Sequence, residues 1–482
     1  MSAGMSESES VGVDVGVNVG VGTGGGGSAG VKVPPYQRFT LDNGARVLLL
    51  PRHDVPLVAC DAVIRGGARL DAPGLAGTAN VAAELLMRGA GDRNAREFAE
   101  AVEGAGGSLE AEARFEAVLV HGQFLSRDQP LMLELLADAL LRPHFAASEF
   151  EPLCRRRIEL LRATRDSDPQ ALLGDYGRAL LFAGHPFGAP LGGDEHTLAA
   201  LRREDVLGFY RDHFGADRLT LVFAGDFEPE AMRLAVTRAL SSWHRAPAAL
   251  PALVPAPRVR GRRVLLVDAP GSAQSYFWIG NVGVARGDGA RAALDIANTA
   301  FGGSFNSMLM QALRARSGLT YSVHSGFRRG SIAGEFSISS FTDKARTGRA
   351  LQIALRTLGR LHTAALDQAA IDSARSYLLG QYPLAFETAA DWGVTLADLD
   401  LYGLEDAWID DYGAALQCVG REEIARVIAT DFPTPENVDI VLIADAARVR
   451  AAVAPFGPVL EKPLAAGDFA PPAGFMDVPA AS

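Results

Sequence analysis

The chain has 482 residues, which is longer than one ordinary hydrophobic core and predicts two or more domains. Its formal net charge of −11 argues against a nucleic-acid-binding groove, so nucleic acid is not an expected partner. Hydrophobic residues at 48% and charged residues at 21% indicate a globular protein rather than a disordered or fibrous one.

Residues 1–34 are rich in Gly, Val and Ser and contain no aromatic residue, so we predict a disordered tail. A secretory signal has a basic region followed by a continuous apolar stretch, and this segment contains neither. No later stretch offers about 18 uninterrupted apolar residues for a membrane span. The default expectation is therefore a cytoplasmic protein without a membrane span.

The two halves of the chain repeat each other at an offset near 217 residues. Arg46–Leu50 (RVLLL) recurs as Arg263–Val267 (RVLLV), and Phe223–Asp226 (FAGD) is answered by Leu442–Asp445 (LIAD). Each half starts with strands, continues into long helical patterns and returns to a strand. We therefore predict an α+β fold of two homologous domains from an internal duplication, each a mostly antiparallel sheet covered by helices.

Composition and the repeat together predict the domain boundaries. Residues 245–261 contain four prolines and are expected to form an extended linker. This linker separates an N-terminal domain at 35–244 from a C-terminal domain at 262–470. The predicted tails are residues 1–34 and 471–482.

The stretch Phe301–Phe327 (FGGSFNSMLMQALRARSGLTYSVHSGF) carries the most informative pattern of the chain. Its double glycine predicts a tight turn, after which Ser304 or Asn306 is expected to cap a short helix. Gly318 is typical of the left-handed residue that ends a helix, and the alternation from Leu319 onward predicts a strand.

Arg314 then lies in the last helical turn and Tyr321 at the entrance of the strand. A reversal between them could aim a guanidinium and a phenol into one cleft, where both can donate hydrogen bonds to a polarised carbonyl. Structural roles remain open, because an arginine near a helix C-terminus interacts well with the helix dipole and a tyrosine packs well in a strand. On spacing alone the structural roles are the simpler interpretation.

The same stretch resembles the C-terminal half of pitrilysin/insulinase-type metallopeptidases, of the two-domain bacterial and mitochondrial-processing-peptidase-like kind. The family pattern of two glycines, a serine, a helix and R-x-x-x-G-L-x-Y-S-V is matched at Gly302, Gly303, Ser307, Arg314, Gly318, Leu319, Tyr321, Ser322 and Val323. The resemblance implies that Arg314 and Tyr321 contact the substrate and that the chain forms half of a clamshell. It also makes the periplasm the alternative location, because many bacterial relatives act there.

In this family a zinc-binding helix carries H-x-x-E-H after a G-L-A-like entry. The entry is present here at Gly74–Ala76, and the functional positions that follow it are Gly77, Asn80 and Val81. Glycine and valine have no side-chain ligand atom, and asparagine cannot take a proton from water as a carboxylate does.

The family's third zinc ligand is a glutamate on a later helix, and its position falls around Leu160 or Leu161. We therefore expect this chain to bind no metal.

A second family feature involves the stretch Gly106–Phe115 (GGSLEAEARF), whose alternation predicts a half-exposed strand. In the family a comparable strand can add an extended peptide to the edge of its sheet. Substrate contacts would then come from Gly107, Ser108, Leu109, Glu110 and Ala111. A plain core strand with its outer face in water is an equally open alternative.

Some bacterial members divide the work between two chains, of which one carries zinc and the other the arginine and tyrosine. By this resemblance we expect the zinc-free subunit of a heteromeric zinc metalloendopeptidase, inactive alone and acting on unfolded peptides. A homologous H-x-x-E-H subunit would hold the zinc, while Arg314 and Tyr321 would orient the substrate carbonyl and stabilise the oxyanion. The alternative is a non-catalytic peptidase-like scaffold or peptide-binding subunit.

Overall fold

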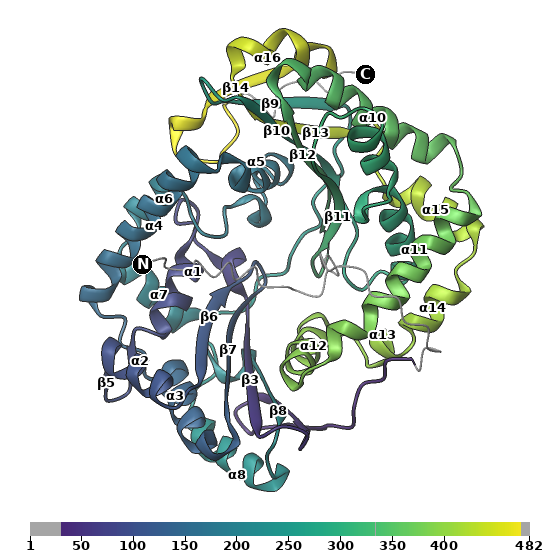
Figure 1. Ribbon diagram of the computed structural model, residues 1–482. Helices are drawn as coiled ribbons and strands as arrows, with labels where there is room; N and C mark the ends of the chain where they lie inside the picture. Colours follow the sequence, from purple (N-terminus) through teal and green to yellow (C-terminus); the bar gives the residue numbers. More distant parts are fainter. Residues whose placement is uncertain (1–29, 333, 474–482) are drawn as a thin grey trace.

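The computed structural model describes residues 30–332 and 334–473, so most of the predicted N-terminal tail and residues 474–482 lie outside the described residues. Within the described part, two six-stranded sheets have the same strand arrangement (Figure 1), and the short strands β4 (Gly89–Ala90) and β5 (Arg93–Asn94) pair separately. The order is β1-β2-β8-β3-β7-β6 in the first sheet and β14-β9-β13-β10-β12-β11 in the second. This equivalence confirms the predicted α+β fold of two homologous domains.

The first sheet consists of β1 (Gln37–Thr40), β2 (Arg46–Pro51), β8 (Leu219–Gly225), β3 (Leu57–Arg65), β7 (Ala117–Leu125) and β6 (Ser108–Ala113). The second consists of β14 (Val459–Pro463), β9 (Arg262–Asp268), β13 (Val438–Ala444), β10 (Gln274–Val282), β12 (Gly334–Asp343) and β11 (Val323–Arg329). Most pairs are antiparallel, as predicted, but β2 pairs with β8 in parallel, and β9 pairs in parallel with β13 and β14.

The strands β8 (LTLVFAG) and β13 (VDIVLIA) are buried along their whole length. Such nearly continuous apolar strands are typical of a sheet that is covered on both faces, because neither side of the strand then meets water.

One face of each sheet is covered by helices of its own half. In the first half these are α1 (Thr78–Leu86), α2 (Ala95–Gly104), α3 (Gln129–Leu141), α4 (Ala147–Ser167), α7 (Arg203–His213) and α8 (Pro229–Leu240). In the second half they include α9 (Arg291–Asn298), α10 (Thr347–Thr363), α11 (Gln368–Gln381), α14 (Tyr412–Cys418), α15 (Arg421–Asp431) and α16 (Ala446–Val453). Among the described residues, no helix combines the length and apolarity needed to cross a membrane.

The two halves exchange one helix each. The helix α5 (Leu173–Leu181) of the first half packs against β10 and β13, and α12 (Ala389–Tyr402) of the second half packs against β3 and β8 (Figure 1). Each helix approaches the foreign sheet at a glycine. A Cβ at Gly177 would lie 2.7 Å from the Trp278 ring, and one at Gly393 would lie 2.3 Å from Asp61 Oδ2. This reciprocal exchange joins the domains through their sheets.

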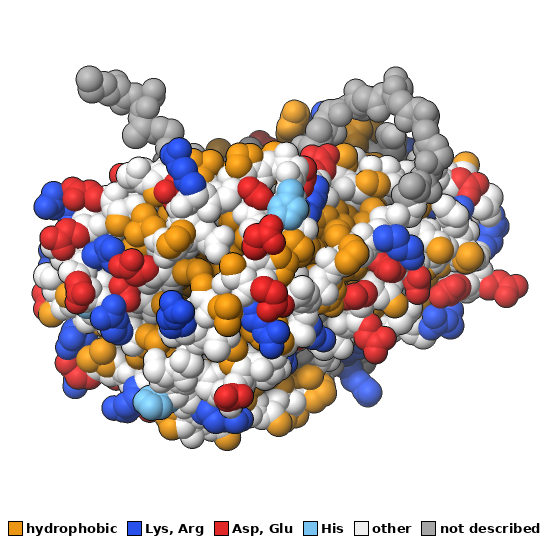
Figure 2. Space-filling view, turned by 90° about the horizontal axis from the view of Figure 1, so that it is seen from below, with side chains coloured by type: hydrophobic (Ala, Val, Ile, Leu, Met, Phe, Trp, Pro, Cys, Tyr) orange, Lys and Arg blue, Asp and Glu red, His pale blue; other side chains and the backbone are white. Residues whose placement is uncertain are grey.

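The residues before β1 lie along the second domain. Val31 and Val33 pack against the core of that domain, and the amide of Val33 donates to Asp410 Oδ1 at 2.7 Å. The Tyr36 hydroxyl donates to Asp406 Oδ1 at 3.0 Å. On the surface seen from below, acidic and basic side chains are interspersed with apolar ones (Figure 2).

Candidate functional site

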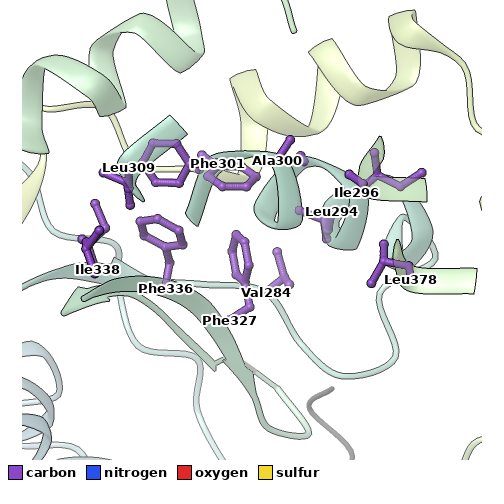
Figure 3. Packing of buried hydrophobic residues seen from close by; sticks show 14 of the residues in the cluster. Val284, Leu294, Ile296, Ala300, Phe301, Leu309, Phe327, Phe336, Ile338 and Leu378 are labelled. Carbon is purple, nitrogen blue, oxygen red and sulfur yellow. The ribbon is translucent and has the colours of Figure 1, made fainter. Parts of the chain in front are cut away.

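A buried aromatic cluster supports the segment that carries the predicted arginine and tyrosine (Figure 3). The ring centroids of Phe301 and Phe336 are 6.2 Å apart, and Leu309 is fully buried beside them. Gly302 lies against β11, since a Cβ at this position would come within 2.3 Å of Ser325 Oγ. The first glycine of the predicted turn is therefore required for close packing of the helix on the strand.

The helix that follows starts later than predicted. Its last turn, η7 (Met310–Ala315), has π-helical hydrogen bonding, a feature that recurs at functional sites. The predicted cap at Ser304 or Asn306 is wrong, because residues 304–307 form a turn, the helix begins at Met308, and Ser304 Oγ donates to a backbone carbonyl of the preceding turn at 3.0 Å. The amide of Met310 instead donates to Ser307 Oγ at 3.4 Å.

Gly318 ends this helix as predicted, with a left-handed φ of +57°. Its amide donates to the carbonyl of Arg314 at 3.0 Å, and the next amide, of Leu319, donates to the carbonyl of Leu313 at 2.9 Å. These two bonds satisfy carbonyls at the end of the helix and turn the chain sharply after Arg314.

The strand after the glycine begins at Val323 and not at Leu319. Thr320 causes the difference: its Oγ1 donates to the carbonyl of Ser322 at 2.7 Å and accepts from the same residue's amide at 3.1 Å. These local bonds hold the backbone in a turn and delay strand pairing. Tyr321 is the residue at the tip of this turn.

The structure brings Arg314 and Tyr321 together. The guanidinium carbon of Arg314 lies 4.7 Å from the centroid of the Tyr321 ring and 4.8 Å from that of Phe305. The Tyr321 and Phe305 side chains are highly exposed, at 72% and 67%. Among the described residues, no hydrogen bond or ion pair engages the Arg314 guanidinium or the Tyr321 hydroxyl, so their donors are free to bind another molecule.

Phe305 was not identified from the sequence. Its position in a turn gives no periodic signal, and its contact with Arg314 depends on how the glycine turn folds back over the helix. The available signal is compositional: a large aromatic residue stands in a Gly- and Ser-rich turn where polar residues are expected.

The helix α1 resembles the family's zinc helix, but the residue at its first zinc-ligand position, Gly77, has no space for a side chain. Gly77 has φ +94°, and a Cβ there would lie 2.9 Å from both the Cα and the amide nitrogen of Gly193. A histidine at this position would collide with the Gly192–Gly193 backbone. Val81 is fully buried, and the Asn80 Oδ1 atom is buried without a hydrogen-bond partner.

The helices α1 and α4 are joined by ion pairs. Glu84 on α1 accepts from Arg157 at 2.8 Å and from Arg88 at 3.2 Å, and it also contacts Arg156. In the part of the chain that the structure describes, no three His, Cys, Asp or Glu side chains group as metal ligands. The residues at these positions therefore do not fit zinc.

The predicted half-exposed strand is β6, which lies at the edge of the first sheet beside β7. Its Leu109 is buried, whereas Ser108 and Glu110 are exposed. Gly107 precedes the strand, and a Cβ there would lie 2.4 Å from Phe124 Cδ1, so packing requires its small size. This strand belongs to the first domain, whereas the Arg314–Tyr321 pair lies in the second, before β11.

Comparisons with known proteins agree with these features. A family model described as Insulinase (Peptidase family M16) matches residues 46–195, and one described as Peptidase M16 inactive domain matches residues 200–378. An uncharacterized zinc protease of Mycobacterium leprae is 27% identical over 369 residues, covering 76% of this chain and 82% of the relative. One of Streptomyces coelicolor is 26% identical over 399 residues, covering 82% and 86%.

Solved structures show the same fold. The crystal structure of a peptidase M16 inactive domain from Pseudomonas fluorescens has a TM-score of 0.79 at 20% identity, covering 85% of this chain and 98% of that chain. A protease from Helicobacter pylori has a TM-score of 0.77 at 19% identity, covering 85% and 99%. With the two family models, which together span residues 46–378, these findings show that the chain belongs to the pitrilysin/insulinase (M16) peptidase family, as a member that lacks its zinc motif.

Proposed function

We propose that this chain is the zinc-free subunit of a heteromeric metalloendopeptidase that encloses and cleaves unfolded peptides. The observation that carries the proposal is the exposed Arg314–Tyr321 pair, which has side-chain donors without acceptors among the described residues. A tyrosine that served only to pack at the entrance of a strand would bury its ring, whereas the Tyr321 ring is 72% exposed beside the guanidinium.

Arg314 and Tyr321 suit the recognition of a peptide carbonyl. The contacts with the rings of Phe305 and Tyr321 restrict the guanidinium to one region and leave its N–H groups available. The guanidinium and the phenol would hold the substrate carbonyl before reaction and donate more strongly as negative charge develops on its oxygen. Preorganised donors of this kind are among the largest contributions to catalysis.

The edge strand β6 is the proposed binding site for the extended substrate backbone. On the side away from β7, no strand pairs with it within the described residues, so its outer N–H and C=O groups can form a ladder with a peptide. Gly107, Ser108, Leu109, Glu110 and Ala111 would make these contacts. Main-chain bonding of this kind gives affinity with a loose sequence preference.

A homologous subunit with an intact H-x-x-E-H helix would supply the metal and the general base. Two observations support this division. The positions of Gly77, Asn80 and Val81 offer no ligand set and no room for one, and relatives of this chain are named zinc proteases. A clamshell of two such chains would then contain each half of the site.

The test is reconstitution with the H-x-x-E-H homologue from the same genome. We expect the isolated chain to bind no stoichiometric zinc and to leave a fluorogenic unfolded peptide intact, whereas the mixed complex cleaves it. Stoichiometric zinc in the isolated chain together with chelator-sensitive hydrolysis would refute the proposal. A stable complex whose activity is unchanged by loss of the Tyr321 hydroxyl would favour the scaffold alternative.

A further inference from the structure

A cavity of about 650 Å³ lies at the junction of the two domains, away from the residues discussed above. Strands β1, β2 and β3 and the 3-10 turn that follows β3 (Gly67–Leu70) contribute arginine side chains. The end of α12 and the β11–β12 loop form the opposite wall. The charged residues that line it are Arg38, Arg46, Arg65, Arg69, Glu116, Asp400 and Glu405. Leu250 of the linker and Ser331 also line this cavity.

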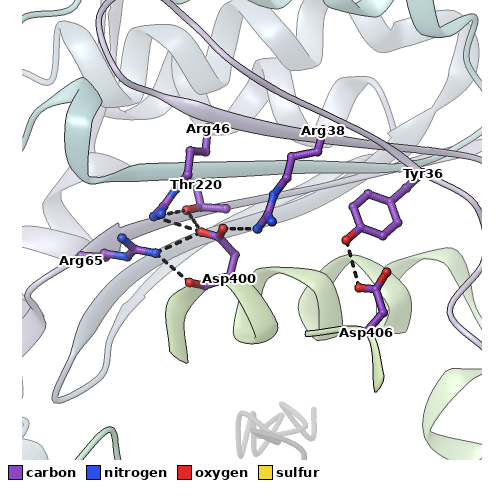
Figure 4. Close-up of polar contacts among 7 residues, drawn as sticks. All are labelled: Tyr36, Arg38, Arg46, Arg65, Thr220, Asp400 and Asp406. Carbon is purple, nitrogen blue, oxygen red and sulfur yellow. Dashed lines mark hydrogen bonds and ion pairs between the residues drawn. The ribbon is translucent and has the colours of Figure 1, made fainter. Parts of the chain in front are cut away.

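One carboxylate is shared by several of these arginines (Figure 4). Asp400, whose side chain is 3% exposed, accepts from Arg38 and pairs with Arg46 at 3.0 Å and with Arg65 at 3.2 Å. Thr220 Oγ1 donates to the same carboxylate. The buried Asp400 carboxylate therefore faces three partly exposed guanidinium groups, so the charge balance immediately around it is positive.

Glu116 and Glu405 reduce this excess, and Glu116 attracts Arg69 electrostatically, so four arginines face three carboxylates in the cavity lining. Glu116 accepts from the amide of Ser331 at 2.9 Å and from the hydroxyl of the same residue. Glu405 is exposed to solvent. Arg69 donates to the carbonyl of Pro251 at 3.2 Å and forms no ion pair within 4.0 Å among the described residues.

Hydrogen-bond donors are left over in the cavity wall. Arg65 donates through Nη2 and Arg69 through Nη1, so the Nη1 atom of Arg65 and the Nη2 atom of Arg69 have no acceptor among the described residues. Burial also lowers the pKa of Arg46, Arg65 and Arg69, because the charged form loses hydration. An anion with several oxygen acceptors would satisfy these donors and balance the positive charge.

We propose that this cavity binds a phosphate-bearing anion, with Arg65 and Arg69 as its principal donors and Arg38 at its side. Planar guanidinium groups match the oxygens of a phosphate in bidentate fashion, and such charge-assisted bonds are stronger than neutral ones. The volume admits a group larger than orthophosphate, such as a diphosphate. This site is separate from the Arg314–Tyr321 pair, and its assignment does not depend on the peptidase proposal.

The anion would join the two domains. The arginines belong to the first domain, whereas Asp400 and Ser331 come from the second. A ligand that binds the folded chain stabilises it in proportion to the logarithm of its concentration above Kd. Diphosphate is therefore expected to raise the unfolding temperature of the whole chain, in addition to binding it.

The experiment titrates inorganic pyrophosphate into the full-length chain by calorimetry and follows thermal unfolding at constant ionic strength. Arg69→Gln removes a donor and leaves the pairs of Asp400 in place. We expect at least a tenfold loss of pyrophosphate affinity, about 1.4 kcal/mol, and loss of the thermal shift. The matched control is Arg96→Gln, an exposed arginine on α2 paired with Glu100 at 2.7 Å, which should bind pyrophosphate like the wild type.

A second variant, Arg38→Gln, is included in case Arg69→Gln does not fold. The Arg38 side chain is 53% exposed on the edge strand β1, so its replacement should not disturb folding. No saturable binding of pyrophosphate up to millimolar concentration would overturn the proposal. So would equal affinity in wild type, Arg69→Gln and Arg38→Gln, or an equal loss in Arg96→Gln. Tighter binding of citrate than of pyrophosphate would show a carboxylate site and overturn the phosphate assignment.

Discussion

The guanidinium carbon of Arg314 lies 4.7 Å from the centroid of the Tyr321 ring, although that ring is 72% exposed. A tyrosine that served only to pack at the start of a strand would bury its ring against neighbouring side chains. Here the turn formed by Thr320 presents the ring to solvent next to a cation that has no carboxylate partner among the described residues. The local fold thus favours a binding role for the pair over the structural role that spacing alone suggested.

The first prediction removes only the Tyr321 hydroxyl. In the reconstituted complex, Tyr321→Phe should lower kcat by about 10²-fold, roughly 3 kcal/mol, because one donor to the developing oxyanion is lost. KM should change much less, since the ring and its contact with Arg314 remain. Steady-state kinetics on a fluorogenic peptide provide the measurement.

Tyr276→Phe is the matched control for this substitution, because Tyr276 is a half-buried tyrosine of β10 in the same domain. It should leave kcat unchanged. An unchanged kcat for Tyr321→Phe, in a complex that still assembles, would show that its hydroxyl takes no part in catalysis.

The second prediction concerns Phe305, which lies 4.8 Å from the Arg314 guanidinium. Phe305→Leu keeps an apolar side chain but removes the ring, so Arg314 should be held less firmly. A cation–π contact at an exposed site contributes about 0.5–1 kcal/mol, which predicts a two- to fivefold lower kcat. The free energy of unfolding should change by less than about 0.5 kcal/mol, because the side chain is 67% exposed. A loss of stability with full activity would contradict a positioning role.

The third prediction tests whether α1 has lost the space for a metal ligand. Gly77→Ala and Gly74→Ala both place a Cβ at positive φ, +94° and +80°, but only the first meets backbone, that of Gly193 at 2.9 Å. Positive φ costs about 1–2 kcal/mol in either variant. Overpacking should add about 1–3 kcal/mol in Gly77→Ala alone, as measured by urea unfolding. Equal unfolding free energies for the two variants would show that the Gly192–Gly193 loop moves to make room for the added Cβ, which would contradict the prediction.

The sequence was sufficient to predict the duplicated fold and the proximity of Arg314 and Tyr321. The repeat preserves strand patterns such as RVLLL, whose apolar character is dictated by burial on both faces. Gly318 is visible because a left-handed residue at a helix end is a local requirement. The later start of β11 arose from a side-chain bond of Thr320 that competes with strand pairing.

Contacts between distant segments could not be predicted. The exchange of α5 and α12 follows from complementary surfaces more than 90 residues apart in the sequence, and each helix alone has an ordinary pattern for a buried helix. Similarly, the anion cavity collects arginines from β1, β2 and β3 around an aspartate from the other half of the chain. No periodicity within one segment carries that information.

The last prediction concerns the pH dependence of the domain junction. Burial raises the pKa of Asp61 to about 8, and the nearby Asp398 adds to the rise while Arg114 opposes it. Asp61 lies on β3 against Gly393 of the exchanged helix α12, so its ionisation would place a charge in the junction.

In the unfolded chain Asp61 has its ordinary pKa of 3.8, so the folded state holds a proton that the unfolded state has lost between about pH 4 and pH 8. The stabilisation is fully present below pH 3.8 and is lost as the pH rises toward 8. Asp61→Asn, which is always neutral, should therefore lose less unfolding free energy than the wild type between pH 5 and pH 8. We expect a difference of at least about 1.4 kcal/mol, the equivalent of one pKa unit, by urea unfolding. Asp42→Asn, an exposed carboxylate of the same domain, should follow the wild type, and the same pH slope in all three proteins would mean that Asp61 ionises normally in the folded chain.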